Sequence, residues 1–176
     1  MAIDESRVFK PINIAVLTVS DTRTPETDTS GDILAARVTG AGHHLAVRMI
    51  VPDDAKRLAA QFEAWIDDPS IDAVVSTGGT GLTGRDVTPE ALSLVAGARD
   101  IPGFGELFRW LSFQSIGTST VQSRACAVVA RGTYIFALPG SNGAVKDGWD
   151  GILAEQLDSR NRPCNFVELM PRLKEV

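Results

Sequence analysis

The chain has 176 residues, of which 44% are hydrophobic and 22% are charged, and its formal net charge is -5. This length and composition are typical of one globular domain that buries most of its apolar surface. The excess of acidic residues argues against a general surface for nucleic acids or anionic membranes.

The N-terminus and the cysteines exclude several further classes of protein. The segment MAIDESRVFKP places acidic residues where a signal peptide needs an apolar run, and no stretch approaches the roughly 18 apolar residues of a membrane span. Cys126 and Cys164 have no C-x-x-C spacing, so neither a disulfide framework nor a zinc site is expected. We expect a cytoplasmic protein with a single domain over 1–176, in which 1–11 and 164–176 are terminal extensions.

Strand and helix patterns alternate through the first half of the chain. Apolar segments rich in β-branched residues predict three strands, at 12–20, 45–51 and 71–77. Apolar residues at helical spacing predict one helix within 28–42, capped by Ser30 and ended by Gly40 or Gly42, and another after Pro52. The third strand leads directly into a loop rich in glycine.

The second half of the chain predicts further helices and one hairpin. A helix start is marked by Thr88 as the N-cap, Pro89 at the first helical position and Glu90 in the first turn. Two short strands on either side of Arg131 and Gly132 predict a hairpin. Other helical patterns lie at 103–115, at 118–128 and after Ser141.

This order of elements predicts an α/β fold of three layers, αβα, with a mostly parallel central sheet. Ligands of such sheets bind beyond the carboxyl ends of the strands. We therefore expect four loops to converge there, at 20–30, 52–54, 78–88 and 139–142.

The segment TGGTGLTGRDVTPEAL, residues 77–92, contains two glycine patterns with known functions. A dinucleotide fingerprint, G-x-G-x-x-G, begins at Gly79. Such a fingerprint needs its last glycine packed in the helix and an acidic residue about 20 positions later at the end of a strand. Here the last glycine lies before the helix, and the acid at that distance, Asp100, has no strand before it. A phosphate-binding P-loop requires Lys and then Ser or Thr, where this chain has Arg85 and Asp86. A nicotinamide enzyme therefore remains only as a pattern match, and the P-loop is excluded by residue type.

A third interpretation of the loop rests on its chemistry. The glycines of 78–81 allow backbone N–H groups to face an anion such as phosphate. The carboxylate of Asp86 would repel a bare phosphate there, so its presence predicts a divalent cation, most simply Mg²⁺, between the two. Asp53, after the second strand, could face the same space. The residues alone leave an alternative open, in which the glycines form a tight turn, Asp86 pairs with Arg85 or caps locally, and Asp53 starts its helix.

Six ordered segments, spread over nearly the whole chain, resemble one known family. They are AVLTVSDTR with DTSG, VPDD, the glycine loop, GFGELFRWLSFQSIGTSTVQSRA, FALPGS and RPCNF. They closely resemble the MoaB/Mog family of molybdenum cofactor biosynthesis proteins, and the middle and tail segments are most similar to its MoaB branch. The resemblance implies a molybdopterin adenylyltransferase, which uses Mg²⁺ to join AMP from ATP to the terminal phosphate of molybdopterin and releases pyrophosphate.

The resemblance also implies roles for individual residues. Asp53 and Asp86 would be the catalytic pair and would hold the metal. The nucleotide and its phosphates would bind at Gly78, Gly79, Thr80, Gly81, Thr88, Pro89, Glu90, Pro139, Gly140 and Ser141. Molybdopterin would bind at Ser20, Asp21, Asp28, Ser30, Gly31, Ser123 and Arg124, of which Arg124 suits a phosphate. For each of these residues a structural role, as a cap, a turn or an ion-pair partner, remains the alternative.

A second class of function is a noncatalytic pterin-binding or scaffold protein, because the MoaB branch is less uniformly tied to catalysis. Retention of Arg85 and Asp86 favours activity. The family forms trimers or hexamers, and the MoaB resemblance favours a homo-hexamer with 104–113 as a candidate interface and other proteins of the pathway as possible partners. We expect His43 and His44 to be solvated loop residues. Packing or subunit contacts are expected of Met49, Phe62, Trp65, Trp110 and Trp149.

Overall fold

The computed structural model describes residues 3–175, so residues 1, 2 and 176 of the predicted domain lie outside the described part. The regular elements are β1 (Asn13–Val19), α1 (Thr29–Gly40), β2 (His44–Val51), α2 (Ala55–Ile66), β3 (Ala73–Thr77), α3 (Thr88–Ser93), β4 (Arg99–Asp100), α4 (Pro102–Ile116), a 3-10 helix (Gly117–Gln122), β5 (Cys126–Ala130), β6 (Thr133–Leu138), α5 (Asn142–Gly148), a π-helical segment (Trp149–Leu153), α6 (Ala154–Gln156), α7 (Phe166–Leu169) and a second 3-10 helix (Met170–Arg172). No helix among the described residues is long and apolar enough to cross a membrane.

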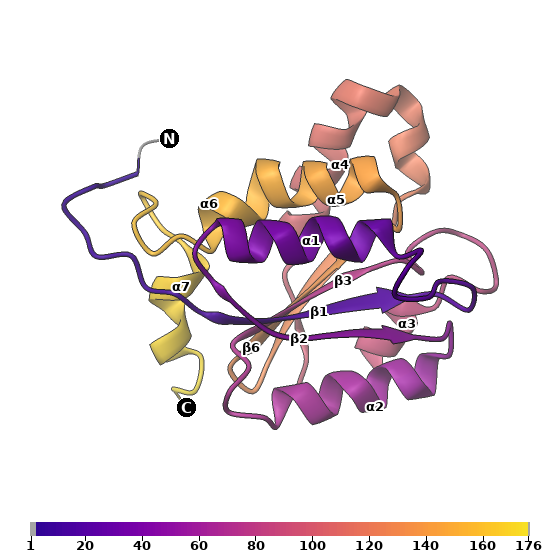
Figure 1. Cartoon of the computed structure of the whole chain (residues 1–176), viewed down its shortest axis with the longest axis horizontal. Helices are drawn as coiled ribbons and strands as arrows, with labels where there is room; N and C mark the ends of the chain where they lie inside the picture. The colour runs from indigo at the N-terminus through magenta and orange to yellow at the C-terminus, as the bar shows by residue number, and fades with distance from the viewer. Residues whose placement is uncertain (1–2, 176) are drawn as a thin grey trace.

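The six strands form one sheet in the order β2-β1-β3-β6-β5-β4. The pairings of β1 with β2, β1 with β3 and β3 with β6 are parallel, whereas β5 is antiparallel to both β6 and β4. Helices α1, α4 and α5 cover one face of the sheet, and α2 and α3 cover the other (Figure 1). The predicted three-layer αβα fold is therefore confirmed, with an antiparallel hairpin at one edge of the sheet.

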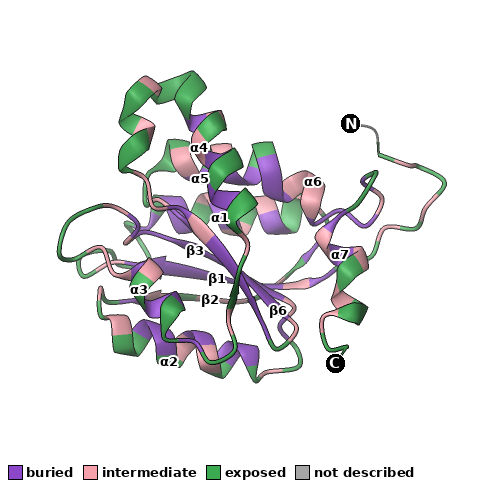
Figure 2. Cartoon of the chain, turned by 180° about the vertical axis from the view of Figure 1, so that it is seen from behind, coloured by how far each residue is buried: buried purple, intermediate pink, exposed green. Residues whose placement is uncertain are grey.

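The core consists of two apolar layers on opposite faces of the sheet. On one face, Leu34 of α1 and Phe108 of α4 pack against strand residues, and on the other face Phe62 of α2 does so. Strands β3 and β6 are buried along their whole length, and β1 is buried in all but its first residue, Asn13 (Figure 2). This burial on both faces explains why the strands appear in the sequence as continuous apolar runs rather than as alternating patterns.

Two predicted helix caps were wrong. Asp28, not Ser30, caps α1, because its side chain accepts a hydrogen bond from the backbone N–H of Gly31. Thr88 lies inside α3 rather than at its cap, and its hydroxyl donates to the carbonyl oxygen of Gly78 at 2.9 Å. Asp28 also accepts hydrogen bonds from Thr18 and Arg48, and the sequence pattern reveals neither these partners nor the bond from Thr88 to Gly78.

Two other local predictions were also wrong, and one strand was missed. The segment 118–128 is not one helix, because its first half forms the 3-10 turn and its end forms β5. The two-residue strand β4 was not predicted. His43 is not solvated but 5% exposed, and its Nδ1 accepts a hydrogen bond from the backbone N–H of Ile12 at 3.3 Å.

The two ends of the chain pack together beside the sheet, on the side opposite the carboxyl ends of the parallel strands (Figure 1). Arg7 forms an ion pair with Glu168 of α7. The ring of Phe166 lies 4.8 Å from that of Tyr134 and 5.3 Å from that of Phe136, measured between centroids. Val167 of the C-terminal segment is part of the buried core, and the ion pair of Arg7 joins the N-terminal segment to it.

One glycine of the site loop tests how tightly the strand ends are packed. Gly78 has φ +104°, and a Cβ placed on it would lie 2.3 Å from the carbonyl oxygen of Val19, whereas Gly97 has φ +72° and open space around it. We expect Gly78→Ala to lower the free energy of unfolding by at least about 2 kcal/mol, through strain and overlap together, and Gly97→Ala by about 1 kcal/mol. Urea denaturation measures both values. Equal losses would contradict this packing.

Candidate functional site

The four loops expected to converge do meet at the carboxyl ends of the parallel strands. The backbone N–H of Ser20 donates to the carbonyl oxygen of Val51 at 2.9 Å, and that of Gly78 donates to Leu138 at 2.9 Å. A Cβ placed on Gly140 would lie 3.3 Å from the Cα of Gly78. The strand order therefore brings loops from four distant parts of the sequence to one edge of the sheet.

The glycine loop runs directly against two acidic side chains. A Cβ on Gly79 would lie 2.4 Å from the hydroxyl of Thr88 and 3.5 Å from Oδ1 of Asp53, and a Cβ on Gly81 would lie 2.7 Å from Oδ2 of Asp86. Gly79 also has φ +66°, which other residues rarely adopt. Glycine at these positions is what allows the backbone to lie beside both carboxylates.

The two carboxylates have opposite electrostatic environments. Burial and the negative charge of Asp86 raise the pKa of Asp53 above its ordinary value. Burial alone would also raise the pKa of Asp86, but hydrogen bonds from the hydroxyl and backbone of Thr83 and from the backbone of Gly81, with the charge of Arg124, lower it. Asp86 is therefore the more firmly ionised of the pair, and Asp53 is ionised at a cost.

Arg124 holds the glycine loop in this position. Its Nε donates to the carbonyl oxygen of Gly81 at 2.7 Å, and one Nη donates to that of Asp86 at 2.6 Å. The guanidinium also forms an ion pair with Glu90, and the backbone N–H of Arg124 donates to Thr80 at 2.9 Å. Because each guanidinium nitrogen is used within the protein, Arg124 shapes the loop rather than offering a free group to a pterin phosphate.

A second network joins the loop after β1 to the loop after β2. Asp21 and Asp53 exchange hydrogen bonds, each backbone N–H donating to the other's carboxylate at 3.1 Å. Arg85 reaches from the glycine loop to form an ion pair with Asp21. The alternative in which Arg85 pairs with Asp86 is therefore not observed, and Asp54 rather than Asp53 caps α2.

The two acids fit a hard divalent cation that is completed by phosphate. Among residues 3–175 no three Asp, Glu, His or Cys side chains gather as a closed metal cage. Mg²⁺ is typically held by one or two carboxylates together with phosphate oxygens and water, so Asp53 and Asp86 supply the part expected of the protein. Their mutual repulsion would be relieved by the cation.

A cavity of about 380 Å³ lies on one side of the glycine loop, between α4 and the start of α5. Thr80, Gly81, Ser123, Pro139 and Ser141 line it. Thr80 is 2% exposed, and its hydroxyl has no hydrogen-bond partner among the described residues. Because an unsatisfied buried hydroxyl is unfavourable, this atom marks a position where a ligand or a water would bind.

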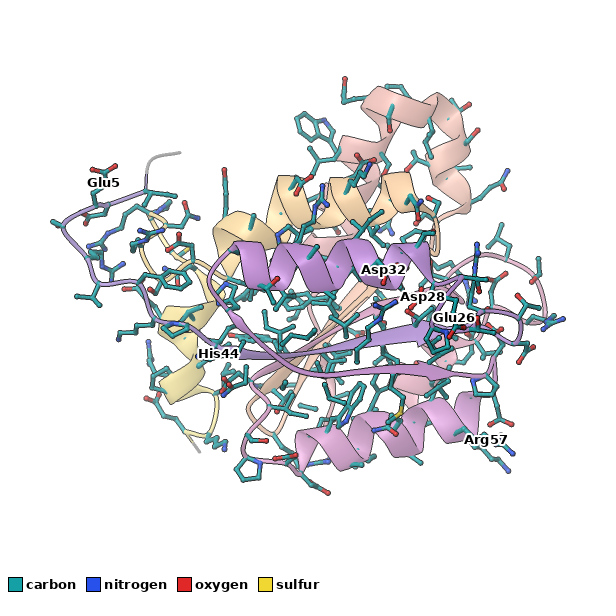
Figure 3. The ribbon with its side chains drawn as sticks, in the orientation of Figure 1. Glu5, Glu26, Asp28, Asp32, His44 and Arg57 are labelled. Atoms are coloured by element: carbon teal, nitrogen blue, oxygen red, sulfur yellow. The ribbon has the colours of Figure 1, made fainter. Side chains whose placement is uncertain are left out.

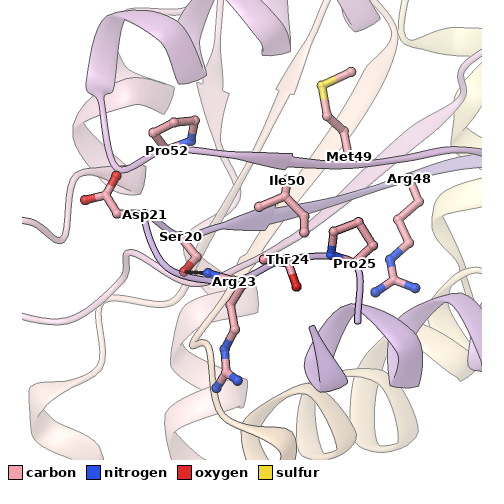
Figure 4. Close-up of a pocket in the computed structure, with 9 residues that line it drawn as sticks. All are labelled: Ser20, Asp21, Arg23, Thr24, Pro25, Arg48, Met49, Ile50 and Pro52. Carbon is pink, nitrogen blue, oxygen red and sulfur yellow. Dashed lines mark hydrogen bonds between the residues drawn. The ribbon is translucent and has the colours of Figure 1, made fainter. Parts of the chain in front are cut away.

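A larger cavity of about 710 Å³ lies on the other side, between the loop after β1 and the edge strand β2 (Figure 4). It is lined by Ser20 and Asp21 together with Arg23, Met49 and others of that loop and strand. The residues that the family resemblance assigns to the pterin are therefore divided, since Ser20 and Asp21 face this cavity and Ser123 faces the smaller one.

Three further residues assigned to the pterin line neither of these two cavities: Asp28, Ser30 and Gly31. Asp28 lies at the start of α1 (Figure 3). It is fully buried there, and Thr18, Arg48 and the backbone N–H of Gly31 donate to its carboxylate. Burial alone would raise the pKa of Asp28, but these hydrogen bonds lower it. Asp28 thus fixes the start of α1 and the loop before it.

The sequence reasoning missed several residues of the smaller cavity. Phe108, Ser112 and Ser115 of α4 and Asp147 of α5 line it, although none belongs to the quoted loop motifs as a site residue. They were assigned to helices by their spacing. The sequence signal that could have identified this side of the cavity is the large number of small polar residues between 112 and 123, in segments that the spacing of apolar residues predicted to be helices.

Comparisons with known proteins agree with this architecture. A family model described as a probable molybdopterin binding domain matches residues 15–159. The chain is 51% identical over 170 residues to molybdenum cofactor biosynthesis protein B of Escherichia coli, covering 97% of this chain and 98% of that protein. The Bacillus subtilis protein of the same name is 41% identical over 160 residues, covering 89% and 94%. A crystal structure of molybdenum cofactor biosynthesis protein B has a TM-score of 0.84 and 35% identity, covering 97% of this chain and all of that one.

The raised pKa of Asp53 predicts how its charge affects stability. Above that pKa the ionised carboxylate is disfavoured in the folded protein relative to the unfolded one, and the penalty vanishes as the pH falls below the ordinary value. Without divalent cations at pH 7, Asp53→Asn should raise the free energy of unfolding, because it removes the repulsion from Asp86. The gain should not exceed about 1 kcal/mol, since solvent screens the two carboxylates from each other. Urea denaturation, repeated with Mg²⁺, measures this effect.

The matched control is Asp67→Asn at the far end of α2, where Arg131 donates to the carboxylate at 3.2 Å. This change should be nearly neutral and insensitive to Mg²⁺, whereas Mg²⁺ should stabilise the wild type more than Asp53→Asn. A loss of stability in cation-free Asp53→Asn would contradict the repulsion between Asp53 and Asp86.

Proposed function

The chain belongs to the molybdopterin-binding family of molybdenum cofactor biosynthesis proteins, and we propose that it is a molybdopterin adenylyltransferase. Its pathway is the synthesis of the molybdenum cofactor. In the proposed reaction an oxygen of the terminal phosphate of molybdopterin attacks the α-phosphorus of ATP. The bond from that phosphorus to the bridging oxygen breaks, and pyrophosphate leaves.

One observation carries this proposal: the glycine backbone lies against two neighbouring carboxylates at the meeting point of the loops. Gly79 lies beside Asp53 and Gly81 beside Asp86, and the charge of Asp86 raises the pKa of Asp53. A pair of acids alone would repel a triphosphate, and glycine backbone alone would bind an anion without a metal. Together they are suited to a nucleotide phosphate that arrives with Mg²⁺.

The residues present could supply what phosphoryl transfer requires, which is positioning and neutralisation of charge rather than a covalent nucleophile. Bound Mg²⁺ would supply positive charge to the phosphate oxygens. Asp86, firmly ionised and fixed by Thr83, would hold the metal with Asp53. The backbone N–H groups of Gly79 and Thr80, which donate to no protein group within residues 3–175, would hold phosphate oxygens.

The remaining predicted residues support this geometry from outside the reacting atoms. Glu90 and Arg124 would keep the loop closed on the phosphates. Ser141 caps α5, and its position in the smaller cavity would place the helix N-terminus near a ligand anion. Asp21 would hold Asp53 in position through the two hydrogen bonds that they exchange.

We expect the purified protein to release pyrophosphate from ATP when molybdopterin and Mg²⁺ are present. Asp86→Asn should reduce the rate by at least about 100-fold, since removal of a charge-stabilising group from a transition state has an effect of that order. Asp67→Asn should retain the wild-type rate. A coupled pyrophosphate assay with freshly prepared molybdopterin measures all three proteins.

The same assay separates the two classes of function. Pterin binding without pyrophosphate release, under conditions in which an established adenylyltransferase is active, would assign the protein to the noncatalytic binding or scaffold class. An unchanged rate for Asp86→Asn would remove this residue from the chemistry.

We also propose that α4 forms a contact between copies of the chain, within a trimer or a hexamer. Leu107, Trp110, Phe113 and Ile116 are 42–62% exposed on this helix. Large apolar and aromatic groups exposed together are typical of interfaces.

Trp110→Glu should therefore shift the protein to smaller species in light scattering. Leu94→Glu, at a 58% exposed position on α3, should leave the assembly unchanged, and equal behaviour of the two variants would argue against an α4 interface.

A further inference from the structure

Arg85, at the exposed tip of the glycine loop, is a basic residue to which the proposed reaction assigns no part. Its side chain is 67% exposed, and within residues 3–175 its guanidinium has one hydrogen-bond partner, Oδ2 of Asp21. A guanidinium carries five N–H donors in a fixed fork. Most of these donors therefore remain available to an anion that binds beside the loop.

The tip of the loop is packed more loosely than its base. Residues 82–85 are all exposed, and a Cβ placed on Gly84, directly before Arg85, would meet no atom within 4 Å. The base is held by Arg124, which donates to the carbonyl oxygens of Gly81 and Asp86. The Arg85 side chain can therefore change its partner without displacing the backbone that positions Asp86.

The carboxylate of Asp21 uses its two oxygens for different partners. Oδ1 accepts from the backbone N–H of Asp53 at 3.1 Å, and Oδ2 accepts from Arg85. Departure of Arg85 would thus leave the bond between Asp21 and Asp53 in place. The side chain of Asp21 is 36% exposed, and ion pairs open to solvent contribute little to stability. An anion of higher charge could take the guanidinium from Asp21.

The phosphates of a nucleotide would place such an anion within reach of Arg85. Asp21 is hydrogen-bonded to Asp53, and Arg85 directly precedes Asp86, so the guanidinium is tied to both loops that carry the proposed metal ligands. Phosphoryl transfer develops negative charge on the departing oxygens, and an arginine is suited to offset it. Arg124 cannot do so, because its guanidinium nitrogens are used within the protein.

We propose that Arg85 exchanges partners during the reaction: Asp21 holds it in the free protein, and the β- and γ-phosphates of the nucleotide hold it in the complex. This inference rests on the proposed function for the identity of the nucleotide. When the bond from the α-phosphorus to the bridging oxygen breaks, its electron pair stays on that oxygen and leaves with pyrophosphate. Arg85 keeps its proton and offsets this charge through hydrogen bonds. Asp21 is a positioning residue that keeps the guanidinium beside the site.

Calorimetric titrations with Mg²⁺ and either the α,β-methylene analogue of ATP or AMP test the contact without requiring catalysis. Arg85→Gln should weaken binding of the analogue at least about tenfold and that of AMP less than about twofold, because AMP lacks the two phosphates concerned. The matched control is Arg172→Gln, which removes an arginine that is 69% exposed and paired with Glu175. Its affinity for both nucleotides should equal that of the wild type.

A second variant distinguishes an exchanged partner from a fixed structural pair. Asp21→Asn keeps an oxygen for the backbone N–H of Asp53 but removes the charge that competes for Arg85. It should tighten binding of the analogue about two- to fivefold, and most of this gain should disappear when Arg85→Gln is also present. If the pair served only to hold the two loops together, both single substitutions would weaken binding. Matching thermal midpoints would show that the variants are folded.

The exchange is refuted if the wild type does not bind the analogue, or if Arg85→Gln leaves its affinity unchanged or weakens AMP equally. It is also refuted if Asp21→Asn weakens binding, or if its full gain persists with Arg85→Gln. Pyrophosphate release by the wild type alongside any of these results for the variants would leave the proposed function standing. The expected affinities without pyrophosphate release would retain the exchange and reject the proposed transfer of AMP.

Discussion

The contacts of Arg124 with the glycine loop determine the geometry on which the rest of the site depends. Carbonyl oxygens at both ends of the loop segment, from Gly81 and from Asp86, accept hydrogen bonds from one guanidinium. Glu90 on α3 fixes that guanidinium from the other side. A planar group with donors in fixed directions can hold two backbone positions at once, which a lysine could not do. The distance between Gly81 and the Asp86 carboxylate follows from this arrangement.

The fold places two acids where they repel each other, and this is unfavourable for the protein alone. Asp86 is compensated by Thr83 and by the charge of Arg124, whereas the pKa of Asp53 is raised by burial and by Asp86. A cation bound between the loop and the phosphates would offset that repulsion. Part of the affinity for a metal nucleotide would then come from relief of a repulsion that the folded chain maintains.

The sequence correctly predicted the elements that a local residue pattern determines. It did not predict features that depend on contacts between distant parts of the chain. Continuous apolar runs identified β1 and β3, and the alternation of strands and helices along the chain correctly predicted that the four loops would meet. The end of a strand does not give the direction of a side chain, however. Ser20 and Ser123 therefore line different cavities, and Asp28 is buried beneath its loop.

The role of Arg124 shows the same limit. Its motif indicated a cation near the site, but its partners are carbonyl oxygens 38 and 43 residues earlier in the chain. Similarly, Asp147 lies on a helix with ordinary packing residues, and only the fold places it in the cavity that Thr80 also lines.

The central claim is that the glycine loop and the two carboxylates bind a nucleotide only together with a divalent cation. Equilibrium dialysis of the α,β-methylene analogue of ATP, with Mg²⁺ and then with a chelator, tests it most directly. The affinity of the wild type should fall at least about tenfold when the metal is removed, because binding of metal and nucleotide is reciprocally linked. In Asp86→Asn the two affinities should differ much less. Equal affinity with and without Mg²⁺ in the wild type would contradict the account.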